Sequence, residues 1–495
     1  MSIKRAILLS LVSWTLLALC YPPFPLGPLA LAVLAPWFYV LRMANKKGAL
    51  GASYLGAFAF NAISMYWLYH VGEVAPPALI FSGLFLAIAY LSLFPLLCAW
   101  IFVKIKDSRL RFLFPLFWAG IEVLRSKGDM SFPWLSLGLT FGNSIELMQA
   151  FTLFGVFGCS ALIVASNMCL AAKKKKLVFV PLALAAVLYI GGALAYDETP
   201  ASDSITVAVV QPSIHQTEKW SKTYYDSVMN QTWNLFETLD PSGVQLILFP
   251  ETAIPANMHV SILEYDFLQT YAEKNNTAIV IGALSRARGA GSEKRLNVYN
   301  SVFLFGFGYP AAEYRKMHLV PFSERVPFDN IFPIVNYVDL GGGDFSPGDS
   351  LEIWQPGNYS PLICYEAIYG DILRAAKRKG AKFITNHTND GWFKKSIAPY
   401  QHFNLVRSHA VENGIGVIRS ANTGISAFIA PNGQIIEKTE LFDKKIIVND
   451  MPLETRWTLY GVIGDYIEWI LFAFSLGMIV AAKISLKIKR ALNRS

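Results

Sequence analysis

Charged residues are scarce in this sequence. Of its 495 residues only 16% are charged, while 54% are hydrophobic, a composition too apolar for an ordinary soluble protein of this length. The net charge of +8 has the sign of a nucleic-acid binder, but the basic residues stand beside apolar runs, at 173–176 and 483–490. Basic clusters in that position indicate membrane topology. We therefore expect a membrane-embedded protein with no nucleic-acid partner.

Cysteine is also scarce, and its five copies form no pair. Cys20, Cys98, Cys159 and Cys169 lie in apolar segments, whereas Cys364 stands alone in a polar stretch. The sequence has no CxxC and no HExxH motif. Neither a disulfide framework nor a metal site is therefore expected, and Cys364 is a candidate free thiol.

Eight apolar runs each come near the roughly 20 residues that cross a bilayer. They lie at about residues 6–20, 26–43, 49–71, 77–103, 111–125, 148–171, 177–196 and 462–482. The second run follows the first directly and no small-residue cleavage site separates them, so the first is interpreted as a retained span and not as a signal peptide. The sequence predicts a bundle of seven spans over residues 1–196 and a final span over 462–482.

Lysine and arginine are nearly absent from alternate loops. Residues 21–25 and 72–76 carry neither, and residues 126–147 carry only Lys127. The other loops are basic, at 46–47, 104–111, 173–176 and 483–494. Because basic loops stay in the cytoplasm, we expect both termini there, including the tail at 483–495. The polar stretch 197–461 then lies outside the cytoplasm.

That polar stretch predicts one α/β domain. Short β-type runs occur at 205–210, 245–249, 278–282, 298–305, 382–386, 416–420 and 425–430, and helical patterns occur at 221–239 and 261–274. Strands alternating with helices at this length are typical of a layered sheet core.

Cys364 stands between an apolar run, which predicts a buried strand, and residues 366–371, which predict the start of a helix. A thiol on such an elbow faces backbone N–H groups and the positive end of the helix dipole. Both favour a thiolate, and later an oxyanion. The alternative is a buried, inert cysteine, because free cysteine is among the most buried residue types.

Glu251 and Lys316 share the setting of Cys364, because each follows an apolar run and precedes a turn. Side chains at strand ends converge at one edge of an α/β sheet. Glu251 would take the thiol proton, Cys364 would attack a carbonyl carbon, and Lys316 would stabilise the oxyanion. The alternative for this trio is surface charges and a core thiol.

Five separated motifs resemble the nitrilase superfamily. They are Pro-Glu-Thr at 250–252, Arg-Lys-Met-His-Leu-Val-Pro-Phe at 315–322, Cys-Tyr-Glu at 364–366, Asn-Asp-Gly-Trp-Phe at 389–393 and Arg-Ser-Ala-Asn-Thr-Gly-Ile-Ser at 419–426. The resemblance covers residues 205–450 and implies an αββα sandwich with a Glu-Lys-Cys triad that acts on amides or acyl groups through a thioester.

The whole chain is similar to the apolipoprotein N-acyltransferase family. The similarity extends to Phe-Pro-Trp-Leu-Ser-Leu-Gly at 132–138 and to the Gln-Pro and Lys-Trp pairs within 211–220, with departures at Leu139 and Ser323 that put local loop shape in doubt. The resemblance implies N-acylation of the α-amino group of the N-terminal S-diacylglyceryl cysteine of apolipoproteins, the last step of lipoprotein maturation. A phospholipid would donate the acyl chain in a ping-pong reaction, without a metal or organic cofactor. The site would lie on the periplasmic side of the bacterial inner membrane.

Four further residues match positions that matter in that family. Glu324 and Glu366 would hold Lys316 and position the amine, although acids in loops are commonly just solvated. Tyr365 would contribute a backbone N–H to the oxyanion hole, its ring serving as core packing. Trp220 would line the lipid entrance, its alternative being an ordinary interfacial or core aromatic.

Two other functions fit parts of the sequence. A membrane-tethered amidase of the same superfamily would hydrolyse a small amide, but the combination of Cys-Tyr-Glu with the loop at 132–138 speaks against it. A transporter with a binding domain would need charges in the middle of its spans, and these are nearly absent.

Overall fold

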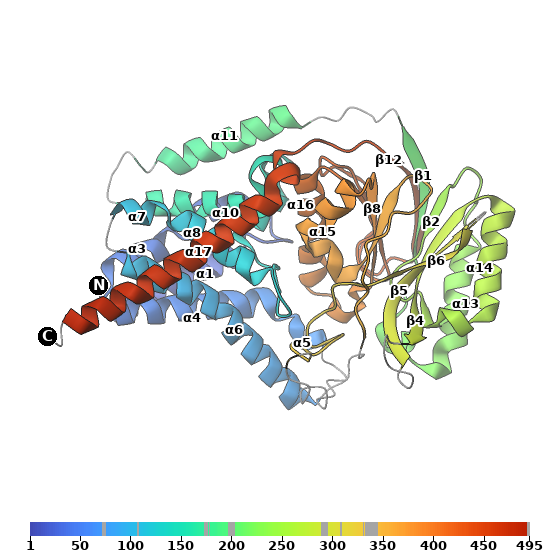
Figure 1. The fold of residues 1–495 in the computed structure, drawn as a ribbon, viewed down its shortest axis with the longest axis horizontal. Helices are drawn as coiled ribbons and strands as arrows, with labels where there is room; N and C mark the ends of the chain where they lie inside the picture. Colours follow the sequence, from blue (N-terminus) through green and yellow to red (C-terminus); the bar gives the residue numbers. More distant parts are fainter. Residues whose placement is uncertain are drawn as a thin grey trace. The chain divides into compact units, whose positions relative to one another are not determined.

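The computed structural model of this chain describes residues 1–71, 76–105, 108–172, 177, 179–196, 203–288, 296–306, 309–329, 331 and 345–492 (Figure 1). The chain divides into two compact units. The helical unit comprises Met1–Tyr196 and Thr458–Ser495, and the sheet unit comprises Asp197–Trp457. The basic segment 173–176 and most of the loop 72–76, on which the predicted topology depends, lie outside the described residues.

The helical unit is built mostly from apolar helices. They are α1 (Ile3–Ala18), α2 (Ala30–Val33), α3 (Ala35–Met43), α4 (Lys46–Met65), α5 (Leu68–Val71), α6 (Pro77–Lys104), α7 (Ser108–Phe112), α8 (Phe114–Arg125), α9 (Ile145–Met148), α10 (Phe151–Leu170), α11 (Phe179–Ala195) and α17 (Leu459–Leu492). Helices pack closely where small residues meet. A Cβ on Gly120 of α8 would collide with the Leu471 carbonyl of α17, and Asn61 of α4 donates to Ser92 of α6 at 3.1 Å. Both features are typical of helix contacts in membranes.

The prediction of eight membrane spans is confirmed only in part. Among the described residues, three helices are long and apolar enough to cross a membrane: Pro77–Lys104, Phe151–Leu170 and Leu459–Lys483. Two shorter apolar helices occupy Gly27–Met43 and Phe179–Ala195. Helices α1 and α8 have only 16 and 12 residues, and α4 begins with two lysines. The apolar runs are therefore helical, but eight full spans are not confirmed.

The sheet unit contains two sheets, and the predicted α/β domain is confirmed. Within the described residues the first sheet has seven strands in the order β12-β1-β2-β4-β5-β6, with β3 paired to β4, and the second has five in the order β11-β10-β9-β8-β7. The strands of the first sheet are β1 (Ser204–Gln211), β2 (Leu246–Leu248), β3 (Ile254–Asn257), β4 (Ala278–Arg288), β5 (Leu296–Gly306), β6 (Tyr309–Arg315) and β12 (Lys445–Pro452). Those of the second are β7 (Tyr359–Ile363), β8 (Phe383–Thr388), β9 (Gly416–Ala421), β10 (Ala427–Ile429) and β11 (Ile435–Lys438).

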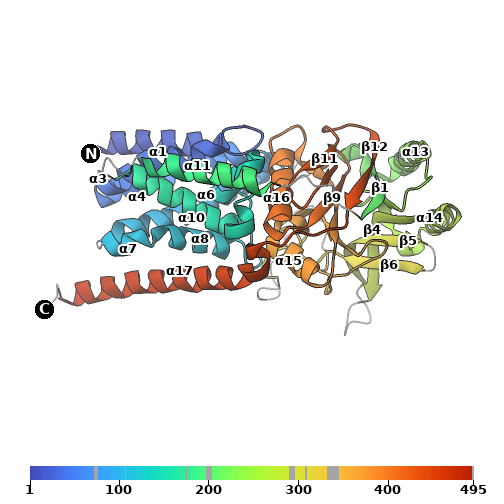
Figure 2. The same cartoon turned by 90° about the horizontal axis from the view of Figure 1, so that it is seen from above.

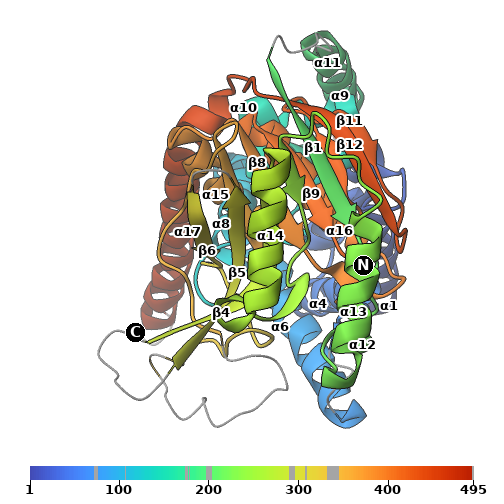
Figure 3. The ribbon, with the colours of Figure 1, turned by 90° about the vertical axis from the view of Figure 1, so that its right-hand side faces the viewer.

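The two sheets face each other between two pairs of helices. The ring Nδ1 of His387 in β8 donates to the carbonyl of Phe249 beside β2 at 2.6 Å, which joins the sheets. Helices α13 (Tyr225–Phe236) and α14 (Ile262–Asn275) pack their apolar residues on the first sheet. Helices α15 (Gly370–Arg378) and α16 (Ala398–Asn413) lie beside the second sheet (Figure 2). Figure 3 shows α13 and α14 running side by side over the first sheet.

The central strands are apolar on both faces because each lies between two layers. Every residue of β2 is buried, and so are the last five residues of β1, from Val207 to Gln211. The pairs β1–β2, β2–β4, β7–β8 and β8–β9 are parallel. Parallel neighbours bring their carboxyl ends to one edge, and polar side chains that follow those ends meet there.

Candidate active site

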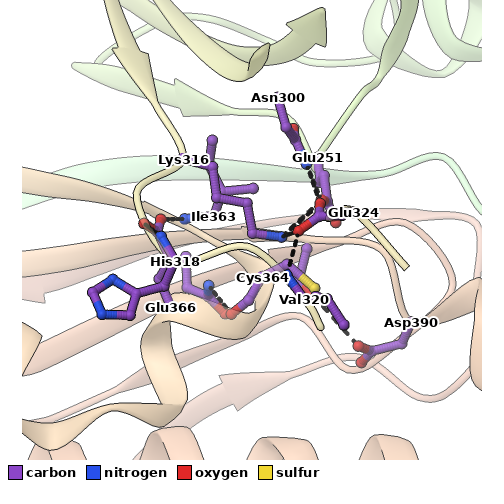
Figure 4. Close-up of polar contacts among 12 residues, drawn as sticks. Glu251, Asn300, Lys316, His318, Val320, Glu324, Ile363, Cys364, Glu366 and Asp390 are labelled. Atoms are coloured by element: carbon purple, nitrogen blue, oxygen red, sulfur yellow. Dashed lines mark hydrogen bonds and ion pairs between the residues drawn. The ribbon is translucent and has the colours of Figure 1, made fainter. Parts of the chain in front are cut away.

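The structure brings Glu251, Lys316 and Cys364 together. Glu251 follows β2, Lys316 directly follows β6 and Cys364 directly follows β7. The Lys316 Nζ lies 3.8 Å from Glu251 Oε1. Figure 4 shows these two side chains converging with Glu324 next to the Cys364 sulfur. The predicted convergence of strand ends accounts for this geometry, while the catalytic roles of the three residues stay a prediction.

Cys364 lies on a sharp elbow. Its φ of +50° places it in the left-handed region, between β7 and a short 3-10 helix over Cys364–Ile368. The side-chain amide of Asn386 donates to the Cys364 carbonyl at 3.2 Å and braces this conformation. A non-glycine residue at positive φ costs about 1–2 kcal/mol, and such strain is typical of nucleophile turns. Cys364 as a whole residue is only partly buried.

Lys316 is held mainly by Glu324. The ammonium is 1% exposed and lies 2.8 Å from Glu324 Oε2, closer than it lies to Glu251. The amide of Asn300 donates to Glu251 Oε1 at 2.6 Å and to Glu324 Oε1 at 3.0 Å, so it links the two carboxylates. The prediction that Glu324 holds Lys316 agrees with this contact. Asn300 was not predicted.

Burial and charge set the protonation of the site. Burial lowers the pKa of Lys316, but the carboxylates of Glu324 and Glu251 outweigh it and raise that pKa, so Lys316 stays an ammonium. Burial, reinforced by the charge of Glu324, raises the pKa of Glu251. Burial and the charge of Glu251 raise the pKa of Cys364 to about 12. A neutral thiol therefore stands beside a carboxyl group whose pKa is raised, a pair suited to proton transfer.

Glu366 supports the site through the backbone. Its Oε2 accepts from the Ile363 N–H at 2.7 Å, and its Oε1 accepts from the N–H of Met317 at 2.7 Å and of His318 at 3.2 Å. Burial raises its pKa to about 7. The sequence predicted that Glu366 holds the Lys316 side chain. Its hydrogen bonds instead fasten the chain after Lys316 to the strand that ends at Cys364.

The two predicted aromatic residues differ in exposure. Tyr365 is buried, and its ring packs against that of Tyr369 with centroids 5.4 Å apart, as expected for core packing. Trp220 is 43% exposed and directly follows helix α12 (Gln216–Lys219).

Sequence reasoning missed two parts of this site. Lys219 is only 3% exposed, and its Nζ donates to the Glu251 carbonyl at 2.9 Å. Beneath the elbow, Arg419 donates to Asn386 Oδ1 at 2.6 Å and to Asp390 Oδ2 at 2.8 Å, so it orients the amide that braces Cys364. Lys219 and Arg419 stand within quoted motifs, but residue type alone does not distinguish a buried cation from a solvated one.

Two family models match this chain. The model described as Carbon-nitrogen hydrolase matches residues 206–457. The model described as Apolipoprotein N-acyltransferase N-terminal domain matches residues 14–169. The first match falls in the sheet unit and contains Glu251, Lys316 and Cys364, and the second falls in the helical unit.

Curated relatives match over most of their length. A protein from Geobacter metallireducens is 30% identical over 98% of this chain and 96% of its own, and one from Haemophilus influenzae is 29% identical over the same shares. A third, from Rickettsia prowazekii, is 30% identical over 87% of this chain and 88% of its own. Each of the three is named apolipoprotein N-acyltransferase.

Proposed function

The chain belongs to the apolipoprotein N-acyltransferase family, and from that membership we propose that it acylates lipoproteins at their N-terminus. The acceptor is the α-amino group of an S-diacylglyceryl cysteine, and the donor is a phospholipid. One observation supports the assignment of this activity to particular residues: the partly exposed Cys364 stands on a positive-φ elbow beside the Lys316–Glu251 pair. This is an arrangement for nucleophilic acyl transfer.

The first half-reaction forms a thioester. Glu251 takes the proton of the Cys364 thiol, and the sulfur attacks the ester carbonyl carbon of the phospholipid. The ammonium of Lys316 stabilises the oxyanion, helped by backbone N–H groups of the elbow such as that of Tyr365. The tetrahedral adduct then breaks its C–O bond, and the lysophospholipid alkoxide leaves with the proton held by Glu251. The acyl chain stays on sulfur.

The second half-reaction transfers the acyl chain to nitrogen. The free α-amino group attacks the thioester carbon and Glu251 accepts a proton from that nitrogen. Lys316 again faces the oxyanion, the C–S bond breaks, and the proton on Glu251 returns to the sulfur. The products are an amide and the original thiol. Because the carrier is a side chain of the protein, the cycle needs no cofactor.

Glu324 keeps Lys316 available for the oxyanion. The ammonium lies at 2.8 Å from Glu324 and at 3.8 Å from Glu251. Because its close ion pair is with Glu324, Lys316 lowers the pKa of Glu251 less than it would at contact distance. Glu366 and Asn300 then fix the two strand ends relative to each other. Trp220, exposed beside Lys219, is proposed to line the way by which lipid reaches the sulfur.

The same proposal includes the membrane topology. Residues 1–196 would form seven spans and 462–482 the eighth, with 197–461 on the periplasmic side and the tail at 483–495 in the cytoplasm. The distribution of Lys and Arg among the loops supports this orientation. Labelling of single cysteines placed in loops 21–25 and 104–111, with a reagent that does not cross membranes, would test it. The proposal requires labelling of the first loop alone.

Intact mass after incubation with phospholipid tests the chemistry. We expect a gain of one acyl chain that hydroxylamine removes, because hydroxylamine cleaves thioesters, and no gain in Cys364→Ala. The matched control is Cys169→Ala, which removes a thiol of the helical unit and should leave the adduct intact. A wild-type protein that gains no acyl chain but releases ammonia from small amides would instead be the tethered amidase.

A further inference from the structure

The charges of the predicted site do not cancel, either before or after the thiolate forms. Lys316 contacts two carboxylates, those of Glu251 and Glu324. After Glu251 has taken the thiol proton, the anions are Cys364 and Glu324, and Lys316 is the one cation among these four residues. A buried group of charges with a net charge is costly, so a further cation beside these residues would stabilise both the Glu251 carboxylate and the thiolate that replaces it.

Lys219 occupies a place from which it can supply that charge. It ends helix α12, is 3% exposed, and its Nζ donates to the backbone carbonyl of Glu251 at 2.9 Å. The charges of both Glu251 and Cys364 act on its ammonium. The other end of α12 is fastened to the second sheet, where the amide of Asn389 donates to Gln216 Oε1 at 2.7 Å. Lys219 is therefore held beside the site and does not extend into solvent.

We propose that Lys219 is a second cationic positioning residue of this active site, which fastens the Glu251 turn and balances the charge of the Cys364 thiolate. The proposal rests on the proposed role of Cys364 as the nucleophile. It assigns two effects to one side chain. The hydrogen bond fixes the turn that carries Glu251, and the positive charge stabilises the Cys364 thiolate once it has formed.

The charge on Lys219 changes with pH in a range where the protein can be assayed. Burial lowers its pKa to about 8, against the opposing pull of Glu251 and Cys364. Lys219 is therefore an ammonium below that pH and loses its charge as the pH rises through about 8. The other charged groups that act on Cys364 are Glu251, Lys316 and Asp390, and all three are unchanged in variants of Lys219. A difference between wild type and a variant with a permanent positive charge at position 219, present only above about pH 8, thus points to Lys219.

The test compares two variants that keep the hydrogen-bond donor and differ in charge. Lys219→Gln can still donate to the Glu251 carbonyl but is neutral, and Lys219→Arg stays positive at every pH used. The measurement is the rate at which iodoacetamide alkylates Cys364 between pH 6 and pH 10, read on its own peptide by mass spectrometry so that the other cysteines do not interfere.

At pH 7 we expect Lys219→Gln to be alkylated about tenfold more slowly than wild type, because an opposite charge nearby lowers a pKa by about one unit or more. Lys219→Arg should stay within about twofold of wild type. The ratio of wild-type to Lys219→Gln rates should fall toward one as the pH passes about 8. If Lys219→Gln does not fold, as judged by thermal melting, Lys219→Met fills the same space without charge and takes its place.

Two results would overturn the proposal. Equal rates in all three proteins would show that the charge does not reach the sulfur. A loss of the same size in Lys219→Gln and Lys219→Arg, constant with pH, would reduce Lys219 to a mechanical tether. Alkylation requires no lipid, so its outcome is separate from that of acyl transfer. A failure of the proposed function would appear as a missing acyl adduct, whatever the alkylation rates are.

Discussion

Replacing Glu324 by Gln tests whether the pKa of Glu251 depends on the ion pair that Lys316 forms with Glu324. In the structure the ammonium lies 2.8 Å from Glu324 and 3.8 Å from Glu251. Without the nearer anion, Lys316 is expected to close on Glu251. With an effective dielectric constant of about 20, its attraction to Glu251 would rise from about 4.4 kcal/mol at 3.8 Å to about 5.9 kcal/mol at 2.8 Å.

That gain of about 1.5 kcal/mol corresponds to about one pKa unit. Glu324→Gln also removes the negative charge that raises the pKa of Glu251, so both effects lower that pKa. A weaker base takes the thiol proton less readily, and acyl-enzyme formation should slow by about three- to tenfold at neutral pH. Since Glu251 acts only when ionised, the acid limb of the rate should move to lower pH by about one unit.

The assay is the single-turnover rate of thioester formation with phospholipid, followed by intact mass from pH 4 to pH 8. Glu324→Asp is the matched control, because it keeps the charge and should keep the acid limb near its wild-type position. A Glu324→Gln protein with an unmoved acid limb, or with an acid limb at higher pH, would refute the reasoning. Thermal melting of both variants separates a change in rate from a loss of fold.

Three further substitutions probe the same chemistry. Glu251→Gln removes the proposed base and should slow thioester formation by about 10²–10⁴-fold, as measured by the same single-turnover assay. Lys316→Met removes the proposed oxyanion partner and should lower the rate of both half-reactions by about 10²–10³-fold, while Lys316→Arg should recover part of it. Arg419→Met leaves the buried Asp390 carboxylate without its arginine and should destabilise the sheet unit by about 3 kcal/mol. The melting temperature should fall by roughly 6–12 °C. Adding Asp390→Asn to the same chain should restore part of that loss.

The sheet unit could be predicted from sequence where strands lie between two layers. Strands β1 and β2 and the first seven residues of β4 appear as nearly continuous apolar runs because both of their faces are buried. The strands that were missed lie toward the edges. Strand β12, for example, pairs only with β1 and leaves Lys445 and Val448 exposed, so its sequence shows neither a continuous run nor a strict alternation.

The site could be predicted in part for the same reason. Glu251, Lys316 and Cys364 each stand where an apolar run stops, and that position is visible in sequence. Asn300 lies inside strand β5, where an amide looks like any outward-facing polar residue. Only the pairing of β5 with β6 brings Asn300 next to the chain at Lys316, whose N–H donates to the Asn300 carbonyl at 2.9 Å. Register across strands is set by tertiary contacts that a single run of sequence does not contain.

The raised pKa of Cys364 bears on why an acyl carrier would favour transfer over hydrolysis. A thiol that ionises reluctantly is also a reluctant leaving group, so its thioester is slower to break down when a weak nucleophile such as water attacks. An amine is a much stronger nucleophile, so its attack depends less on an easy departure of the sulfur, although in both reactions Glu251 can pass the proton of the nucleophile to the sulfur as the C–S bond breaks. Burial at Cys364 thus slows the unwanted reaction more than the wanted one. On this reasoning, Lys219→Gln, which should raise the thiol pKa further, would lengthen the life of the acyl-enzyme in water even as it slows its formation.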